Sequence, residues 1–187
     1  GEHYTQVFQR SGWLETVIAR PHNTYGPREH FRGHNGEVIP RFILWALAGK
    51  PPLVFGDGSQ TRDFTYVFDT VECLVQMAVH PDTAGHTLNI CRGQEVSIME
   101  IAQHIAQLTG LNSTPEHGPN RPSDVLRLLG DPSKLMSVLG QKPETGIELG
   151  LSQTVEWFRN NILISDDVLR ELETTNWETV EPEDWLP

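Results

Sequence analysis

The sequence predicts an α/β fold. Short apolar runs typical of strands alternate with longer apolar patterns typical of helices along most of the 187 residues, and no segment is repeated. A hydrophobic content of 37% is enough to form a core of ordinary proportions in one globular domain, or in one and a half.

The expected elements follow one another in a regular order. Residues 3–11 are the end of a helix that Gly12 terminates, and residues 16–19 form a β-branched run suited to a buried parallel strand. Further strands are expected at 53–55, 64–67 and 86–90, and further helices at 37–47, 70–79, 97–109, 132–139 and 152–161.

The strongest local signal begins at Ser97. This serine is a good N-cap, and Glu100 three residues later completes a capping box. Ile101 and Ile105 then lie on one helical face before Gly110 ends the helix.

The charge of the chain excludes one large class of ligand. The 14 Lys and Arg residues stand against 25 Asp and Glu residues, which gives a formal net charge of −11. A protein that binds nucleic acid by general electrostatics needs a basic face, so we do not expect a nucleic-acid partner. An anionic small ligand would need a few well-placed arginines.

Cys73 and Cys91 lie in apolar stretches and lack the spacing of metal ligands. We therefore expect buried thiols in a reducing compartment, and a cytoplasmic protein, rather than a disulfide. No apolar run approaches the roughly 18 residues of a membrane span, and no signal pattern opens the chain. The chain begins with Gly1 rather than methionine, which suggests a fragment, a processed product or an artificial truncation.

Two motifs, RPHNTYGP at residues 20–27 and GDGSQTRDF at residues 56–64, resemble the substrate-binding half of extended short-chain dehydrogenases. This family contains the nucleotide-sugar epimerases and 4,6-dehydratases, and the likeness runs from about residue 1 to residue 160. It implies the C-terminal, substrate-binding portion of an extended Rossmann-type dehydrogenase without the N-terminal dinucleotide-binding strands. The family's cofactor is NAD and its ligand is a nucleoside diphosphate sugar.

The resemblance also suggests a division of the chain. Residues 1–161 would be a truncated nucleotide-sugar-binding domain, of which residues 1–27 are a remnant of the Rossmann part. Residues 162–187 are acidic and would form a short helix and an extended tail that docks, if at all, through Trp177 and Trp185.

Two arginines are the main candidates for ligand binding. Arg62 follows a glycine-rich turn at the mouth of a strand, where a guanidinium can hold two diphosphate oxygens, although a surface salt bridge is the alternative. The resemblance implies that Arg62 binds the pyrophosphate, that Arg121 adds a second charge across the same cleft, and that Asp124 contacts sugar hydroxyls. Without this resemblance, Arg121 and Asp124 would be read as residues of a loop with no assigned function.

Four further positions match the family's site. Phe55 would stack on the nucleobase, with core packing as the alternative. Asn23 would contact the sugar-phosphate, unless it serves only the turn, and Pro21 would lie where the backbone meets the nicotinamide. Asn89 would bond to nucleotide phosphates, and an asparagine inside a strand needs some such reason.

Other features depart from the family or lack a role. The family commonly has Val-Asp-Asp where this chain has Val67-Phe68-Asp69, and Asp69 is expected to cap the following helix. His30 and His34 are four residues apart, but nearby glycines and the lack of a third ligand favour solvated loop histidines over a metal site.

The sequence lacks the family's catalytic and cofactor motifs. It contains no glycine-rich dinucleotide turn, and neither Tyr4, Tyr25 nor Tyr66 is followed four residues later by lysine. In relatives that tyrosine and lysine lie just upstream of a Gly-Glu like Gly1-Glu2. We therefore expect no catalytic residue in this chain, no NAD bound by the chain alone, and no activity in isolation.

Three hypotheses remain open. The first is a nucleotide-sugar-binding part of an epimerase or dehydratase, with the later motif most like the 4,6-dehydratases, that combines with a separate cofactor-binding chain. The second is an orphan structural or interaction domain that forms homo-oligomers through an exposed sheet edge at residues 16–19. The third is a small oxidoreductase with an unrecognised cofactor site.

Overall fold

A computed structural model describes residues 1–33 and 35–172 and divides the chain into two compact units. Unit 1 comprises Gly1–Gly26, Thr61–Val96 and Arg127–Gly150, and unit 2 comprises Pro27–Gln60, Ser97–Leu126 and the described part of Leu151–Pro187. Each unit is therefore assembled from three separate stretches of chain. The domain boundary expected at residue 161 stays a prediction.

Unit 1 contains a parallel strand pair. Strand β1 (Ile18–Pro21) pairs with β6 (Thr87–Ile90), so that Ile18 lies opposite Thr87 and Pro21 opposite Ile90. Helices α1 (Glu2–Arg10), α3 (Val67–Val79) and α5 (Ser133–Leu139) accompany these strands, and Pro81–Thr83 forms a 3-10 turn. The core of this unit is formed by Cys73, Met77, Leu88, Ile90 and Leu135.

Shorter strands complete unit 1. Strand β2 (Thr24–Tyr25) pairs in parallel with β5 (Thr65–Tyr66), and β4 (Thr61–Arg62) pairs in parallel with β9 (Arg127–Leu128). Strand β7 (Val96–Ser97) lies on the other side of β4. These pairings place the motif at residues 56–64 beside strands from distant parts of the sequence.

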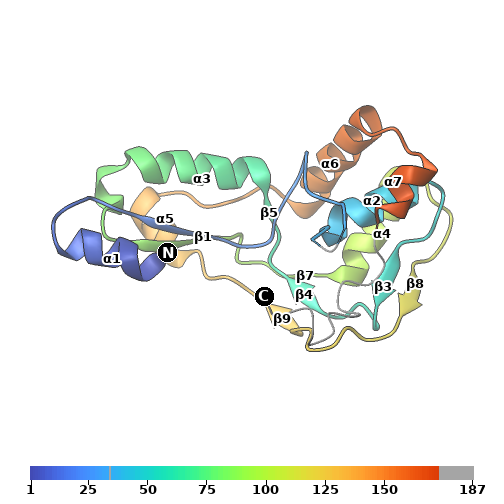
Figure 1. The fold of residues 1–187 in the computed structure, drawn as a ribbon, viewed down its shortest axis with the longest axis horizontal. Helices are drawn as coiled ribbons and strands as arrows, with labels where there is room; N and C mark the ends of the chain where they lie inside the picture. Colours follow the sequence, from blue (N-terminus) through green and yellow to red (C-terminus); the bar gives the residue numbers. More distant parts are fainter. Residues whose placement is uncertain (34, 173–187) are drawn as a thin grey trace, which may run out of the picture. The chain divides into compact units, whose positions relative to one another are not determined.

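Unit 2 is built mainly from helices around one further strand pair. Strand β3 (Leu53–Phe55) pairs in parallel with β8 (Glu116–Gly118), and the two lie side by side in Figure 1. Helix α2 (Val38–Leu47) packs against α4 (Ile98–Thr109). Helix α6 (Ile147–Asn161) begins in the last stretch of unit 1, up to Gly150, and continues in unit 2, where the short α7 (Asp166–Arg170) follows.

The α/β class is confirmed, and the expected capping box is present. The Ser97 hydroxyl accepts a hydrogen bond from the Glu100 amide at 3.1 Å, and the Glu100 carboxylate accepts one from the Ser97 amide at 2.8 Å. Gly110 ends α4 in the left-handed conformation, with φ of 76°. The local rule worked here because each partner lies within one helical turn of the other.

The strand expected at residues 16–19 begins later, at Ile18. The amide of Thr16 instead donates to the Gln9 side chain at 2.5 Å, and the ladder starts where Ile18 donates to His86 at 2.9 Å. The strand expected at 64–67 is also shorter, because Val67 already begins α3. Helix α6 begins five residues before the expected 152.

The prediction that Asp69 caps α3 is wrong. Tyr66 is the N-cap and makes no side-chain cap bond, while Asp69 lies inside the first turn. The Asp69 carboxylate accepts hydrogen bonds from the amides of Glu144 and Thr145, at 2.9 and 2.8 Å, and from the Thr145 hydroxyl at 2.7 Å. It therefore joins α3 to a segment about 75 residues away, which no local pattern could indicate.

Both cysteines are buried and unbridged, as expected. Burial raises the pKa of the Cys73 thiol to about 11 and that of Cys91 to about 12. A short helix, α7, lies in the expected acidic region, whereas Trp177 and Trp185 lie outside the described residues. Within residues 1–33 and 35–172, no helix has both the length and the apolar character to cross a membrane.

Candidate functional site

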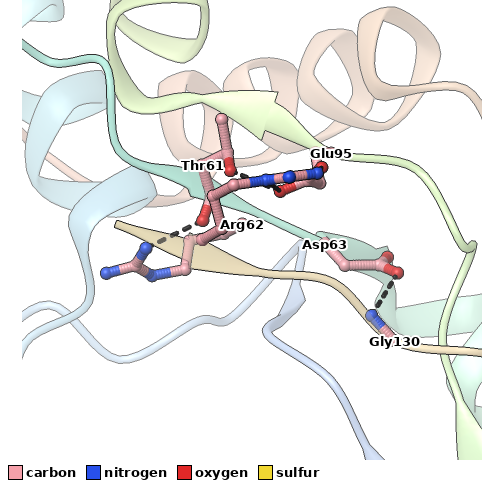
Figure 2. Close-up of polar contacts among 6 residues, drawn as sticks. Thr61, Arg62, Asp63, Glu95 and Gly130 are labelled. Atoms are coloured by element: carbon pink, nitrogen blue, oxygen red, sulfur yellow. Dashed lines mark hydrogen bonds and ion pairs between the residues drawn. The ribbon is translucent and has the colours of Figure 1, made fainter. Parts of the chain in front are cut away.

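Arg62 lies at the end of the two-residue strand β4 in unit 1. Successive side chains on a strand point to opposite faces, so the side chains of Thr61 and Arg62 lie on opposite faces of β4. The Arg62 guanidinium donates to the carbonyl of Thr61 at 2.8 Å and, in Figure 2, points away from both Asp63 and Glu95. The half-buried side chain thus occupies its own face of the strand.

Glu95 binds the opposite face of the same strand. Its carboxylate accepts hydrogen bonds from the Thr61 hydroxyl at 2.6 Å and from Arg127 Nε at 3.0 Å, and it forms an ion pair with Arg127. Hydrogen bonds from Arg127 and then from Thr61 lower the pKa of the Glu95 carboxyl to about 2. This network of hydrogen bonds joins β4 to β9 directly beside Arg62.

Asp63 follows β4 and is completely buried, with a relative exposure of 0%. Its carboxylate accepts hydrogen bonds from three backbone amides, those of Arg92 at 3.1 Å, Gly93 at 2.9 Å and Gly130 at 3.3 Å. Figure 2 shows this carboxylate beside Gly130, on the side of the strand away from the Arg62 guanidinium. A buried carboxylate is tolerated only where such donors surround it.

Asn23 is brought next to this strand. Its side-chain amide donates to the carbonyl of Asp63 at 3.0 Å, and its own carbonyl accepts from the Thr65 amide at 3.2 Å. Its φ of 28° lies in the left-handed region, which asparagine tolerates better than most residues. These bonds agree with the turn interpretation, and the contact with a sugar-phosphate stays a prediction.

Pro21 and Asn89 lie on the paired strands β1 and β6. Pro21 is the last residue of β1, opposite Ile90, and Asn89 lies opposite Arg20. The Asn89 side chain donates to the Asp131 carbonyl at 3.4 Å, which gives this strand asparagine a structural partner. The predicted contacts of Pro21 with nicotinamide and of Asn89 with phosphate stay predictions.

Unit 2 carries the glycine-rich turn and Phe55. Gly56 and Gly58 have φ of 70° and 77°, a region that favours glycine, and the Asp57 carboxylate accepts from the Ser59 amide at 2.9 Å. Phe55 is half-buried, and a Cβ on Gly118 would lie 2.9 Å from its ring. The Phe55 ring therefore rests on the bare backbone of β8.

Arg121 and Asp124 lie on an exposed loop of unit 2 after β8. The Asp124 amide donates to the Arg121 carbonyl at 3.4 Å. The segment before this loop lies against the turn, since a Cβ on Gly56 would be 2.7 Å from Asn120 Oδ1. The fold thus places Phe55 and the start of the Arg121 loop on neighbouring segments of unit 2.

Arg62 belongs to unit 1 and Arg121 to unit 2. The convergence of the two guanidinium groups on one diphosphate stays a prediction. His30 contacts the Arg32 carbonyl at 2.9 Å, and His34 lies outside the described residues. In the part of the chain that the structure describes, no three His, Cys, Asp or Glu side chains are grouped to hold a metal ion.

Asp63 and Glu95 are functional candidates that were not predicted from the sequence. For Asp63, a usable signal was its position between Arg62 and the apolar run that begins at Phe64, because a charged residue there must be solvated or bonded. Nothing local indicated Glu95, whose partner Arg127 is 32 residues away.

Comparison with known proteins agrees with this α/β arrangement. Residues 1–91 match the model of the NAD dependent epimerase/dehydratase family. The chain is 36% identical over 160 residues to a UDP-glucose 4-epimerase of Mycolicibacterium smegmatis, which covers 86% of this chain and 50% of that protein. It is 40% identical over 152 residues to a UDP-N-acetyl-alpha-D-glucosaminuronate decarboxylase of Bacillus cytotoxicus, covering 78% and 47%.

A similar solved structure is the UDP-glucose 4-epimerase of Thermotoga maritima with UDP-glucose. The TM-score is 0.80 at 31% identity, and the match covers 85% of this chain and 50% of that chain. The chain thus spans about half the length of the relatives that it matches. The sequence motifs, the α/β fold and these matches together support the NAD-dependent epimerase/dehydratase family for a chain that covers about half of its relatives.

Proposed function

We propose that this chain is the nucleotide-sugar-binding part of an NAD-dependent epimerase or dehydratase, and that it binds the diphosphate of a UDP-linked sugar through Arg62. The observation that carries the proposal is the position of Arg62 at the end of β4. There the next residue, Asp63, accepts a hydrogen bond from the Arg92 amide, and the Arg62 guanidinium lies on the other side of the strand, where it donates to the Thr61 carbonyl. A guanidinium offers paired N–H donors whose spacing matches two phosphate oxygens.

The comparisons support the choice of ligand. One relative is described as an epimerase of UDP-glucose, another as a decarboxylase of a UDP-linked amino sugar acid, and one solved relative contains UDP-glucose. The remaining contacts are proposed in the same way: Asn23, Asn89 and Pro21 from unit 1, and Phe55, Arg121 and Asp124 from unit 2. The complete enzyme would transfer a hydride from C4 of the sugar to NAD, epimerise or eliminate, and then return the hydride to the sugar. We keep the 4,6-dehydratase branch as the finer proposal.

Titration of UDP-glucose into the purified 187-residue chain tests the proposal by calorimetry. The wild-type chain should bind saturably, and Arg62→Ala should weaken binding about 10- to 100-fold, because hydrogen bonds to a charged group are lost. Arg127→Ala is the matched control. It removes an equal charge from the neighbouring strand β9, but the Arg127 guanidinium is engaged with Glu95, so affinity should change less than about threefold.

Absence of saturable binding by the wild-type chain would contradict the proposal. Equal losses in Arg62→Ala and Arg127→Ala would also contradict it, because they would indicate general charge attraction. Repeating the titration at higher salt separates the two cases, since screening weakens general attraction more than a bidentate contact.

A second candidate function, an interaction domain, is favoured by the exposed apolar face of α3. Phe68, Val71, Val75 and Val79 recur at helical spacing, and each is at least 48% exposed. In the described part of the chain, β1 pairs with β6 alone, and a two-stranded parallel sheet is an unusual end point for a fold. A homo-oligomer or a separate cofactor-binding chain would cover such a surface.

Sedimentation velocity tests this second candidate. If α3 mediates self-association, the double substitution Val71→Lys and Val75→Lys should convert an oligomer to a monomer, because two charges would have to be buried. Leu163→Lys, at a residue 85% exposed in unit 2, is the control and should leave the sedimentation coefficient unchanged. A monomeric wild-type chain over the whole concentration range would exclude homo-oligomerisation.

A further inference from the structure

Both carboxylate oxygens of Asp63 accept hydrogen bonds from backbone amides. One oxygen accepts from the Arg92 amide at 3.1 Å, and the other accepts from the amides of Gly93 and Gly130 at 2.9 and 3.3 Å. The side chain is completely buried. Ionised oxygens that accept several N–H groups form some of the stronger hydrogen bonds in proteins, so this residue is held firmly in place.

The backbone of Asp63 is bonded as well. Its amide donates to the Leu128 carbonyl at 2.9 Å, and its carbonyl accepts from the Asn23 side chain at 3.0 Å. One residue therefore connects the segments after β1, β6 and β9 with the end of β4. All of these contacts lie within unit 1.

The packing around the donors leaves little room for movement. A Cβ on Gly130 would lie 2.5 Å from Cys91 Sγ and 2.9 Å from His22 Cε1. Gly93 has φ of 75°, and a Cβ there would lie 3.0 Å from Pro132. A side chain at either position would crowd these neighbours, so the two donor segments pack here with glycine.

Arg62 is the residue directly before this anchored position. Its side chain points to the opposite face of β4, away from the Asp63 carboxylate (Figure 2). A shift of the Asp63 backbone would therefore rotate the strand end and redirect the Arg62 guanidinium. A displacement of this kind is costly where two donors must match two oxygens of one diphosphate.

We propose that Asp63 is a positioning residue that fixes the direction of Arg62 toward the diphosphate without touching the ligand itself. This inference rests on the proposed function of Arg62. Asp63 acts by holding the segments after β6 and β9 against the end of β4. Its loss therefore affects ligand affinity through Arg62 and not through a direct contact.

The experiment uses Asp63→Asn, which keeps the size of the side chain and removes the charge and part of its acceptor capacity. In the 187-residue chain, UDP-glucose affinity should fall about tenfold, as expected for the loss of charged hydrogen bonds that act through a neighbour. Asp69→Asn is the matched control, because Asp69 also accepts two backbone amides of unit 1, those of Glu144 and Thr145. It should lower the melting temperature without changing UDP-glucose affinity.

A double-mutant cycle separates positioning from general destabilisation. In the Arg62→Ala background, Asp63→Asn should reduce affinity less than twofold further, because Asp63 acts through Arg62. Additive losses would overturn the inference, as would an unchanged affinity in Asp63→Asn when Arg62→Ala binds weakly. Either result leaves the proposed function of Arg62 intact.

Amide hydrogen exchange gives a readout that needs no ligand. Asp63→Asn should speed exchange at Arg92, Gly93 and Gly130, while the amides of Glu144 and Thr145 keep their wild-type rates. Unchanged exchange at the first three amides would overturn the inference even if UDP-glucose does not bind. A third result is also possible: exchange is faster in the variant, but the wild-type chain does not bind UDP-glucose. This result would overturn the proposed function, and with it the role of Asp63 in ligand binding.

Discussion

Helix α3 in unit 1 and helix α4 in unit 2 have similar apolar content but use it differently. Helix α4 buries five residues, which are Ile98, Ile101, Ala102, Ile105 and Ala106. Helix α3 is one residue longer, yet it buries only Thr70, Cys73 and Met77 and exposes an apolar stripe along its length. Apolar surface of this kind usually belongs to an interface.

The two units also hold their candidate ligand residues in different ways. In unit 1, Arg62 stands next to a buried carboxylate bonded to three amides. In unit 2, Arg121 and Asp124 lie on an exposed loop. Unit 1 thus combines a firmly hydrogen-bonded interior at Asp63 with an exposed apolar stripe on α3, whereas α4 in unit 2 buries most of its apolar residues.

The largest expected effect tests this contrast in packing. Ile105→Ala in α4 should lower the free energy of unfolding by about 2–5 kcal/mol, because it leaves a cavity at a fully buried position. Val75→Ala in α3, at a residue 53% exposed, should cost less than about 0.5 kcal/mol in dilute, monomeric protein. Urea denaturation measures both, and equal losses would show that α3 is already covered in solution.

A smaller effect tests whether the interior of unit 1 is tightly packed despite its exposed helix. Alanine normally stabilises a helix relative to glycine, but a Cβ on Gly150 in α6 would lie 2.0 Å from Tyr25 Oη. Gly150→Ala should therefore destabilise the protein by about 1–3 kcal/mol. Gly146→Ala meets no atom within 4 Å and serves as the control in thermal denaturation. Stabilisation by Gly150→Ala would mean that the residues around Gly150 move aside for the added methyl group at little cost in free energy.

The smallest effect concerns pH and the network beside Arg62. The folded-state pKa of Glu95 is about 2, below its ordinary 4.5, so its ionised form stabilises the fold above pH 4.5 and this contribution is lost as pH falls toward 2. The stability difference between wild type and Glu95→Gln should therefore shrink over that window. Arg127→Ala should remove most of the same pH dependence, because Arg127 is the main cause of the shift. A difference that grows on acidification would contradict this assignment.

Much of the local structure was predictable because its causes lie close together in the sequence. The capping box at Ser97, the glycine that ends α4 and the strand at residues 53–55 depend on neighbours within a few residues. Burial of both cysteines followed from their apolar surroundings. The motif around Arg62 also pointed to the family.

The errors arose where distant segments compete with local rules. Asp69 looked like a helix cap, but donors at Glu144 and Thr145 bind its carboxylate instead. The first strand starts late because the Gln9 side chain bonds to the Thr16 amide. Neither partner could be identified from spacing.

By itself, the sequence determined the alternation of helices and strands, their stop signals and the chemical types available for binding an anion, since these depend on local propensity and on composition. Tertiary structure alone decided that Asp63 is buried among amides from two distant loops and that Glu95 meets Arg127. Hydrogen bonds between residues tens of positions apart form only after the chain has folded. For this reason the sequence identified Arg62 as a candidate anion-binding residue, but it did not reveal the hydrogen bonds of Asp63 that hold the strand end beside it.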